Sequence, residues 1–252
     1  MPKISVVLPT YNGSKFLDES IASVVSQTFT DWELIIIDDC SSDSTPEIIG
    51  RWVKKDARIV SYRNKDNLRL PRSLNEGFKR ASGEFHTWTS DDNIYREDAF
   101  QVMYDALTDN SRFDLVYCNI NRIDENGVPF EGRSFNGGPS LLYFFNVVQA
   151  CFLYRSNIFD ELSGYDSDLF LVEDYDFWIR ANRSHKFLHL DVAPYFYRMH
   201  KGSLTSTRAK DIRGKACELL SREFGVEGLS LMAKLKIAIA LAYNRFMFAA
   251  AR

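Results

Sequence analysis

The chain contains 252 residues, of which 31 are lysine or arginine and 34 are aspartate or glutamate, giving a net charge of −3. This length can bury a sizeable core as one large domain or two fused subdomains, and the balanced charge gives no reason to expect a nucleic-acid partner. Cys40, Cys118, Cys151 and Cys217 form no Cys-x-x-Cys pair, so we expect reduced thiols and a cytoplasmic protein.

Residues 1–118 are predicted to alternate strands and helices. The runs Ile4–Leu8 and Glu33–Ile37 are almost entirely apolar, which is typical of parallel strands covered by helices on both faces. Because the first strand begins at Ile4, no secretory signal is expected before it. The further elements predicted here are helices from Ser14, from Asp43, from about Pro71 and over Arg96–Leu107, and strands at Ile59–Tyr62, Glu84–Trp88 and Leu115–Cys118.

After residue 118 the pattern changes to short extended and helical pieces. Asp124–Gly127 is a turn signal between two extended segments. We therefore expect a first half at residues 1–118, a second half of the same domain at 119–205, and a helical C-terminal extension at 206–252. The elements predicted after the turn are a helical stretch around Leu141–Val147 and then Ala150–Tyr154, leading to a helix after Ser156, the helix Asp174–Arg183, strands at Phe187–Leu190 and Tyr195–Tyr197, and a helix from about Arg208 with a break at Gly225–Gly228.

The last segment, Leu229–Arg252, contains no acidic residue, carries four basic ones, and is apolar on nearly all sides. Its uncharged stretches are too short to span a bilayer. We expect it to pack on the rest of the chain or to form a homodimer contact. The alternative is that it lies at an anionic membrane surface as a peripheral anchor.

Polar residues follow three of the predicted strands where each strand ends. Pro9–Asn12 follows the first strand, Asp38-Asp39 the second, and Asp91-Asp92 the strand that begins at Glu84. The carboxyl ends of parallel strands share one edge of an open α/β sheet, and ligands bind in the crevice beside that edge. Four carboxylates gathered there repel one another unless a cation or a hydrogen-bond donor lies among them. The sequence therefore predicts a divalent metal ion and a polar, phosphorylated ligand.

Individual roles follow from the chemistry of these residues. Asp91 and Asp92 are predicted metal ligands, because Mg²⁺ or Mn²⁺ is usually held by one or two carboxylates together with substrate phosphates; the alternative is a solvated turn that caps the next helix. Asp39 is predicted to accept a hydrogen bond from a base N–H, with an Asx-turn as its alternative. Pro9–Asn12 is predicted to reach the nucleoside, and Gly13 alone does not make a Gly-x-Gly-x-x-Gly loop, so nicotinamide and flavin are not expected.

Glu173 and Asp174 begin a predicted helix that also carries Trp178. Asp174 is predicted to be a general base that takes a proton from an attacking hydroxyl, and the alternative is a simple partner for the helix dipole. We expect the helix start to keep Asp174 ionised near neutral pH, with a low pKa, so that proton removal is concerted with bond formation. Glu173, Trp178 and Gln149 are predicted on the side of the attacking substrate.

A basic loop, Tyr197–Ser203, follows the last predicted strand. His200 in this loop is predicted to ligate the metal or, together with Arg198 and Lys201, to contact a diphosphate. The alternative is an ordinary exposed loop. Gly202 and the serine- and threonine-rich run after it indicate a mobile flap.

Taken together, these segments resemble the family 2 glycosyltransferases, which are inverting enzymes of the GT-A fold. The opening strand with Pro9–Asn12 is similar to the family's nucleotide loop, and Ser20–Asp39 to its second signature. Leu74–Gly77 and Ala81–Glu84 lead into Asp91-Asp92, and Glu173-Asp174 with Phe177–Arg180 resembles the family's Glu-Asp motif. The resemblance covers about residues 3–205.

The resemblance implies an α/β fold of GT-A type, a Rossmann-like, mixed but mostly parallel sheet flanked by helices. It implies that Thr10, Tyr11 and Asp39 hold the nucleoside, and that Arg72 lies in a stretch that contacts the base or diphosphate. It places Asp91 and Asp92 in a metal-binding Asp-x-Asp region and Asp174 in the base position. Two departures are Thr89, where many members have a further aspartate, and Asn67–Arg69, where a glycine is common.

The activity implied is transfer of a sugar from a nucleoside-diphosphate donor, with UDP favoured, to the hydroxyl of a glycan or lipid-linked saccharide. The same resemblance implies bacterial surface polysaccharide synthesis at the inner face of the plasma membrane. One alternative is a nucleotidyltransferase that forms sugar nucleotides, although Pro9–Lys15 lacks the glycine-rich, lysine-bearing loop which that chemistry needs. The other is a catalytically silent module that only binds sugar nucleotides.

Overall fold

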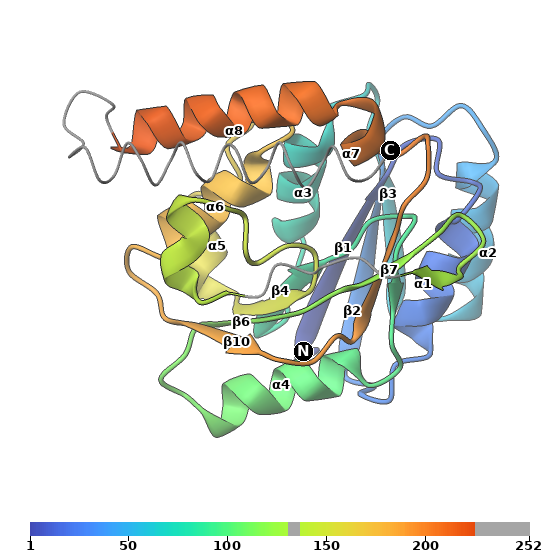
Figure 1. Ribbon diagram of the computed structural model, residues 1–252. Coiled ribbons are helices and arrows are strands. Elements are labelled where there is room, and N and C mark those ends of the chain that lie inside the picture. Colours follow the sequence, from blue (N-terminus) through green and yellow to red (C-terminus); the bar gives the residue numbers. More distant parts are fainter. Residues whose placement is uncertain (131–136, 225–252) are drawn as a thin grey trace.

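The computed structural model describes residues 1–130 and 137–224. Its centre is a seven-stranded sheet in the order β10-β6-β9-β4-β1-β2-β3. Figure 1 shows helices on both sides of this sheet. All neighbouring strands are parallel except β9, which runs antiparallel to β4 and β6. The strands are β1 (Ile4–Thr10), β2 (Trp32–Asp38), β3 (Ile59–Arg63), β4 (Phe85–Trp88), β6 (Leu115–Cys118), β9 (Phe152–Arg155) and β10 (Phe187–Leu190).

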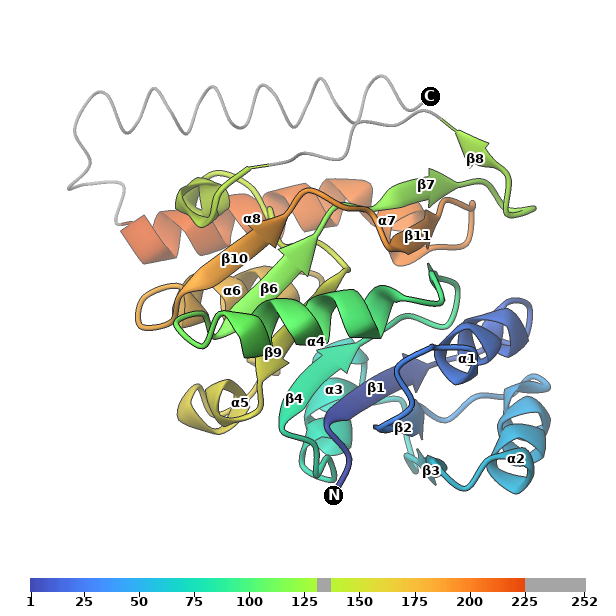
Figure 2. The same cartoon turned by 90° about the horizontal axis from the view of Figure 1, so that it is seen from below.

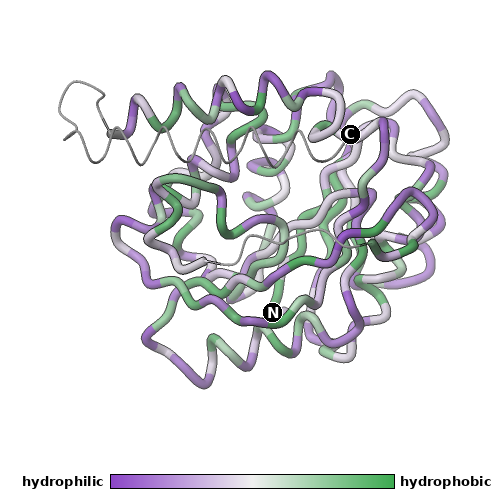
Figure 3. Tube along the Cα trace, viewed as in Figure 1, coloured by the Kyte–Doolittle hydropathy of each residue, from purple (hydrophilic) through white to green (hydrophobic). Residues whose placement is uncertain are grey.

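Helices cover both faces of this sheet because successive side chains of its strands point in opposite directions. In β1, Val6 and Leu8 pack with α1, α2 and α4, whereas Val7 packs with α3, α6 and α8. The view in Figure 2 shows the helices on the two sides, and Figure 3 shows hydrophobic stretches in the central strands with hydrophilic ones at the periphery. The helices are α1 (Leu17–Val25), α2 (Thr45–Lys55), α3 (Leu70–Phe78), α4 (Ala99–Asp109), α5 (Asn157–Glu161), α6 (Glu173–Ala181), α7 (Leu204–Thr207) and α8 (Ala209–Phe224).

A second, four-stranded sheet has the order β5-β11-β7-β8. It joins the segment after Asp91-Asp92 to the strand before the basic loop, because β5 pairs antiparallel with β11. This pairing brings His200 to the carboxyl ends of the central strands. The strands are β5 (Ile94–Tyr95), β7 (Asn121–Ile123), β8 (Pro129–Phe130) and β11 (Tyr195–Arg198).

Most predicted elements are confirmed, and the segment after residue 138 holds the main error. The helical stretch predicted at Leu141–Val147 is only a short 3₁₀ helix, η1 (Pro139–Tyr143). Ala150–Tyr154 is not helical, because Phe152–Arg155 forms the central strand β9. A short buried apolar run does not distinguish strand from helix by periodicity, and here its pairing with β4 and β6 decides the outcome.

The C-terminal extension is partly described. The helix predicted from about Arg208 is α8, which begins at Ala209 and buries Leu219 and Leu220 against the core. The predicted break at Gly225–Gly228 and the segment Leu229–Arg252 lie outside the described residues. Within residues 1–130 and 137–224, no helix combines the length and apolar character needed to cross a bilayer.

Candidate active site

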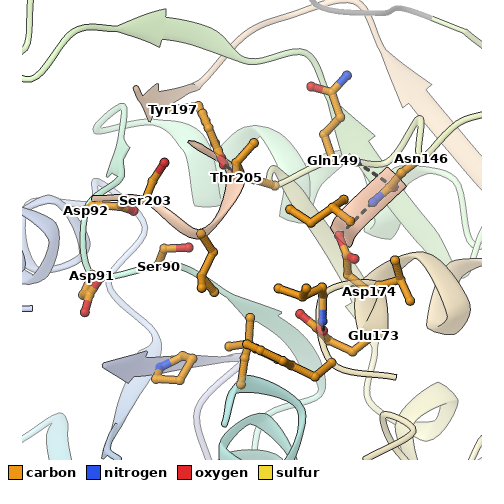
Figure 4. Close-up of a pocket in the computed structure, with 18 of the residues that line it drawn as sticks. Ser90, Asp91, Asp92, Asn146, Gln149, Glu173, Asp174, Tyr197, Ser203 and Thr205 are labelled. Atoms are coloured by element: carbon orange, nitrogen blue, oxygen red, sulfur yellow. Dashed lines mark hydrogen bonds between the residues drawn. The ribbon is translucent and has the colours of Figure 1, made fainter. Parts of the chain in front are cut away.

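A pocket of about 1340 Å³ lies at the carboxyl ends of β1, β2 and β4. Asp39, Asp91, Asp92 and Asp174 all line it, although they are far apart in the sequence. Figure 4 shows Asp91 and Asp92 on one side of the pocket and Glu173 with Asp174 on the other. Pro9, Thr10, Tyr11, Gln149, His200 and Lys201, all predicted as site residues, also line this pocket.

The loop after β1 holds Asp91 closely. The Thr10 hydroxyl donates a hydrogen bond of 2.5 Å to Asp91 Oδ2. Gly13 lies so near that a Cβ built on it would stand 2.0 Å from the same oxygen and 2.5 Å from Thr10 Oγ1. Burial, followed by the negative charge of Asp92, raises the pKa of Asp91 to about 7. Asp91 is therefore a confined carboxylate that a cation or a donor group would stabilise in its charged form.

Asp92 is paired with His200 from the loop after β11. His200 Nε2 lies 2.9 Å from Asp92 Oδ2, and its ring packs edge-on against Phe16 with centroids 5.0 Å apart. Burial raises the pKa of Asp92, while His200 and Arg198 act in the opposite direction. All three residues predicted as metal ligands, Asp91, Asp92 and His200, line the pocket, and two of them are in direct contact.

Across the described ranges, 1–130 and 137–224, no three His, Cys, Asp or Glu side chains converge closely enough to hold a metal by themselves. Asp92 with His200, next to Asp91, instead offers oxygen donors and one imidazole. Such a set fits Mg²⁺ or Mn²⁺ when a bound phosphate supplies further ligands, because these ions commonly use one or two carboxylates plus substrate oxygens.

Asp39 organises the loop that follows β3. Its carboxylate accepts bonds of 2.8 Å from the backbone N–H groups of Leu68 and Arg69 and from the Asn64 side chain. These bonds hold Arg69 at φ 68°, in the left-handed region, where the resemblance leads one to expect a glycine nearby. Each carboxylate oxygen has two lone pairs, so Asp39 Oδ2 keeps capacity for a ligand N–H.

Asp174 and Glu173 open α6 on the other side of the pocket. Asp174 Oδ2 accepts a 2.7 Å bond from Asn146 Nδ2, and Oδ1 accepts one of 2.7 Å from the Tyr175 N–H. Burial raises the pKa of both acids, and the charge of Asp174 adds to the rise for Glu173. The low pKa expected for Asp174 from its helix-start position was wrong, because desolvation outweighs the donors at the helix N-terminus.

Three predicted site residues do not line this pocket. Arg198 is 2% exposed, and its guanidinium donates to the backbone oxygens of Asp92 and Glu125 and to the Glu19 carboxylate. It is a structural cross-link, so a diphosphate contact was the wrong prediction. Trp178 is fully buried against Phe152, which rules out a place on the pocket wall.

Arg72, the third of these residues, is exposed and lines a smaller neighbouring groove. Sequence reasoning also missed Asn146 and Arg69, both of which line the main pocket. Asn146 lies in a segment that the sequence predicts to be a helix, and nothing in that pattern indicates that its side-chain amide binds Asp174. The Asn67–Arg69 segment departs from the family pattern, but no local sequence pattern indicates that Asp39 fixes its backbone.

The matching family profile is described as "Glycosyl transferase family 2" and covers residues 5–173. An uncharacterized glycosyltransferase of Methanocaldococcus jannaschii is 33% identical over 188 residues, covering 71% of this chain and 64% of that protein. The GalNAc(5)-diNAcBac-PP-undecaprenol beta-1,3-glucosyltransferase of Campylobacter jejuni is 27% identical over 224 residues, covering 81% of this chain and 72% of that protein. The chain thus spans slightly less than two thirds of the first relative.

Solved structures share the fold. S. aureus TarS, residues 1–349 in complex with UDP, superposes with a TM-score of 0.70 at 22% identity, over 95% of this chain and 70% of that one. A mannosyltransferase from Pyrobaculum calidifontis, in complex with GDP-Man and Mn²⁺, gives a TM-score of 0.65 at 17% identity, over 100% and 76%. The architecture is the GT-A fold, and with the profile match to residues 5–173 the chain belongs to glycosyl transferase family 2.

Proposed function

We propose that this glycosyltransferase inverts the configuration of the transferred sugar by a single in-line displacement. The observation that carries the proposal is that Asp174 and the Asp91-Asp92 pair lie on opposite sides of one pocket (Figure 4). A donor whose diphosphate lies at Asp91-Asp92 would present its anomeric carbon towards Asp174. The acceptor hydroxyl gives its proton to Asp174 while its oxygen attacks that carbon, and the nucleoside diphosphate leaves from the opposite face. No covalent nucleophile is required.

The raised pKa of Asp174 supports its role as the base. A carboxylate whose proton affinity is raised by burial takes a hydroxyl proton more readily than an exposed one. Glu173, whose pKa burial also raises, would keep a proton and so would not compete for this role. Its carboxyl oxygen Oε2 instead accepts a 2.7 Å bond from the Leu171 N–H, which fixes the start of α6.

The proposed donor is a UDP-sugar. Pro9, Thr10, Tyr11 and Asp39 form the part of the pocket next to the carboxyl ends of β1 and β2, where a nucleoside would lie. The TarS structure contains UDP and the P. calidifontis structure contains GDP-Man, so fold likeness alone favours neither base. The remaining acceptor capacity of Asp39 matches the single N3–H of uracil.

A divalent ion is part of the proposal. Asp91, Asp92 and His200 would hold Mg²⁺ or Mn²⁺, and the ion would neutralise charge on the leaving diphosphate. The Mn²⁺ in the P. calidifontis complex is consistent with this assignment. Lys201, the residue after His200, also lines the pocket and would add positive charge near the phosphates.

The proposed acceptor is a glycan or lipid-linked saccharide, in the synthesis of bacterial surface polysaccharide at the cytoplasmic face of the membrane. The name of the C. jejuni relative specifies a diphosphate-linked lipid saccharide as its substrate. Gln149 and Asn146 come from the second half of the chain and line the pocket beside Asp174 (Figure 4). The acceptor hydroxyl would approach from this side.

Two measurements test the proposal. The melting temperature is measured with UDP, GDP and dTDP, with and without Mn²⁺, and should rise most with UDP and Mn²⁺ together. An equal rise with and without Mn²⁺ would contradict the assignment of the ion. With the donor identified, Asp174→Asn should lower the turnover roughly 10²- to 10⁴-fold while donor affinity persists. Asp160→Asn, which changes an exposed acid of α5, is the matched control. Unchanged turnover in Asp174→Asn would rule out this residue as the base.

A further inference from the structure

A second groove, of about 320 Å³, borders the main pocket. The two share Asn67, Arg69 and Phe170 as lining residues. Three separate segments build the groove: the loop before α3 with the first turn of that helix, the loop that leads to α6, and the middle of α8. The remaining lining residues are Leu68, Arg72, Ser167, Asp168 and Lys215.

The groove gathers positive charge. Arg69, Arg72 and Lys215 line it, and Asp168 is the one acid among its lining residues. Within the described residues, none of these three cations forms a salt bridge with a carboxylate. The guanidinium of Arg69 instead lies 5.4 Å from the Phe170 ring centroid. Arg69 and Arg72 come from the segment at the start of α3 and Lys215 comes from α8. Like charges that line one groove repel one another, and an anion among them removes that repulsion.

The position of Arg72 supports this interpretation. Arg72 lies in the first turn of α3, and that turn contains no acidic residue. The partial positive charge at a helix N-terminus favours anions there and disfavours cations, by about 0.3–1 kcal/mol for an exposed group. Arg72 therefore occupies a position that is unfavourable for stability, and a bound anion would compensate for it.

We propose that this groove binds a phosphate or diphosphate group carried by the acceptor. The inference rests on the proposed glycosyl transfer. The proposed donor diphosphate lies at Asp91, Asp92 and His200, and none of these residues lines the groove. Ser167, Asp168 and Phe170 belong instead to the loop that leads into Asp174. An anion held there would be anchored on the polypeptide that carries the proposed base.

The binding test uses inorganic phosphate as the probe, with saturating UDP and Mg²⁺ to occupy the donor site. At constant ionic strength, phosphate should raise the melting temperature of the wild type by about 2–4 °C at twenty times its Kd. Arg72→Gln/Lys215→Gln should abolish this rise, whereas Lys54→Gln/Arg112→Gln, which removes two exposed cations outside both pockets, should retain it. Asp168→Asn should increase it. No rise in the wild type, or an equal rise in Arg72→Gln/Lys215→Gln, overturns the site.

The kinetic test identifies the source of the anion. Two acceptors with the same saccharide are compared, one as a neutral alkyl glycoside and one linked through a diphosphate to a short alkyl chain. Arg72→Gln/Lys215→Gln should reduce the preference for the diphosphate acceptor roughly tenfold, as expected for two partly exposed ion contacts, with the donor KM unchanged. A rise in the donor KM alone assigns the groove to the donor and overturns the proposal. Absence of transfer to either acceptor is a failure of the proposed function, whereas the phosphate test does not depend on turnover.

Discussion

Asp38 and Asp39, at the end of β2, are held differently from Glu173 and Asp174, at the start of α6. On the side of β1 and β2, Asp39 accepts three hydrogen bonds from the following loop, and Asp38 is bound by Arg63 at 2.8 Å. On the side of α6, burial raises the pKa of both Glu173 and Asp174. The first arrangement fixes a loop that shapes a binding surface. The second preserves proton affinity, which a base requires.

This difference separates residues that build the pocket from residues that would perform chemistry in it. Replacing a structural residue should lower the stability of the protein. Replacing a catalytic or binding residue should lower the rate or the affinity while the fold persists.

The largest effect is expected from Arg198, whose contacts are structural. Arg198→Met would leave the backbone oxygens of Asp92 and Glu125 without their donor and Glu19 without its cation. Removing one partner of such a buried network costs about 3 kcal/mol of unfolding free energy. Denaturant unfolding measures the loss. Lys201→Gln, an exposed cation of the same loop, should leave stability unchanged and raise the donor KM; the reverse pattern would place Arg198 at the diphosphate.

The second effect concerns His86, where the two halves of the chain meet. Its ring is 5% exposed and packs against Phe78, Tyr154 and Phe159. Burial lowers its pKa from 6.5 to about 4. The unfolded chain therefore binds a proton more readily, so stability is complete above pH 6.5 and falls by up to about 3 kcal/mol as the pH drops towards 4.

Replacing this histidine tests the sign of the effect. In His86→Phe, the slope of unfolding free energy against pH between 6.5 and 4 should become shallower, whatever the absolute stability at neutral pH. Urea unfolding at several pH values measures the slope. If the slope is the same in the variant and the wild type, other groups account for the acid sensitivity.

The third effect concerns Gly13, a structural residue that contacts Asp91, one of the proposed metal ligands. In Gly13→Ala the new methyl group would meet Asp91 Oδ2 at 2.0 Å, so the carboxylate must turn away and lose its bond from Thr10. Displacement of about 1 Å at such a site costs on the order of 10²-fold in rate or affinity. Calorimetry of Mn²⁺ and UDP binding measures this loss. Gly50→Ala, where a methyl group meets nothing within 4 Å, is the control; equal binding by both variants would show that Asp91 tolerates the shift.

Much of the donor side could be predicted from the sequence because it depends on local patterns. Apolar strands that end in Pro9–Asn12, Asp38-Asp39 and Asp91-Asp92 define both the sheet and its functional edge. Parallel pairing then makes their convergence a geometric consequence: Thr10 is the direct partner of Asp38 in the β1–β2 register.

The acceptor side depends on contacts between distant segments, which local patterns do not encode. Asn146 lies between η1 and β9, and its bond to Asp174 joins two residues that are 28 positions apart in the sequence. Arg198 looks like a flap cation in sequence, yet carbonyl groups from two other loops surround it. In both cases the partner decides the role of the residue, and the partner is set by the tertiary fold.

The smallest effect is expected from Asn146, and it tests whether the acceptor side tunes its base. The Asn146 amide donates to Asp174 Oδ2 at 2.7 Å and so stabilises the ionised carboxylate. Asn146→Ala should raise the pKa of Asp174 further. Because a base acts only when deprotonated, the acid limb of the rate profile should move to higher pH, with the turnover near neutral pH reduced about tenfold.

The pH profile separates tuning from a structural role. Asn146 Oδ1 also accepts the Gln149 N–H at 3.3 Å, so the variant can lose some stability for that reason alone. A purely structural loss would lower the melting temperature and the active fraction while leaving the acid limb in place. Asn157→Ala, which removes an exposed amide bonded to Glu161 on α5, should change neither. An unmoved acid limb in Asn146→Ala would mean that the Asn146 bond does not tune the proton affinity of Asp174.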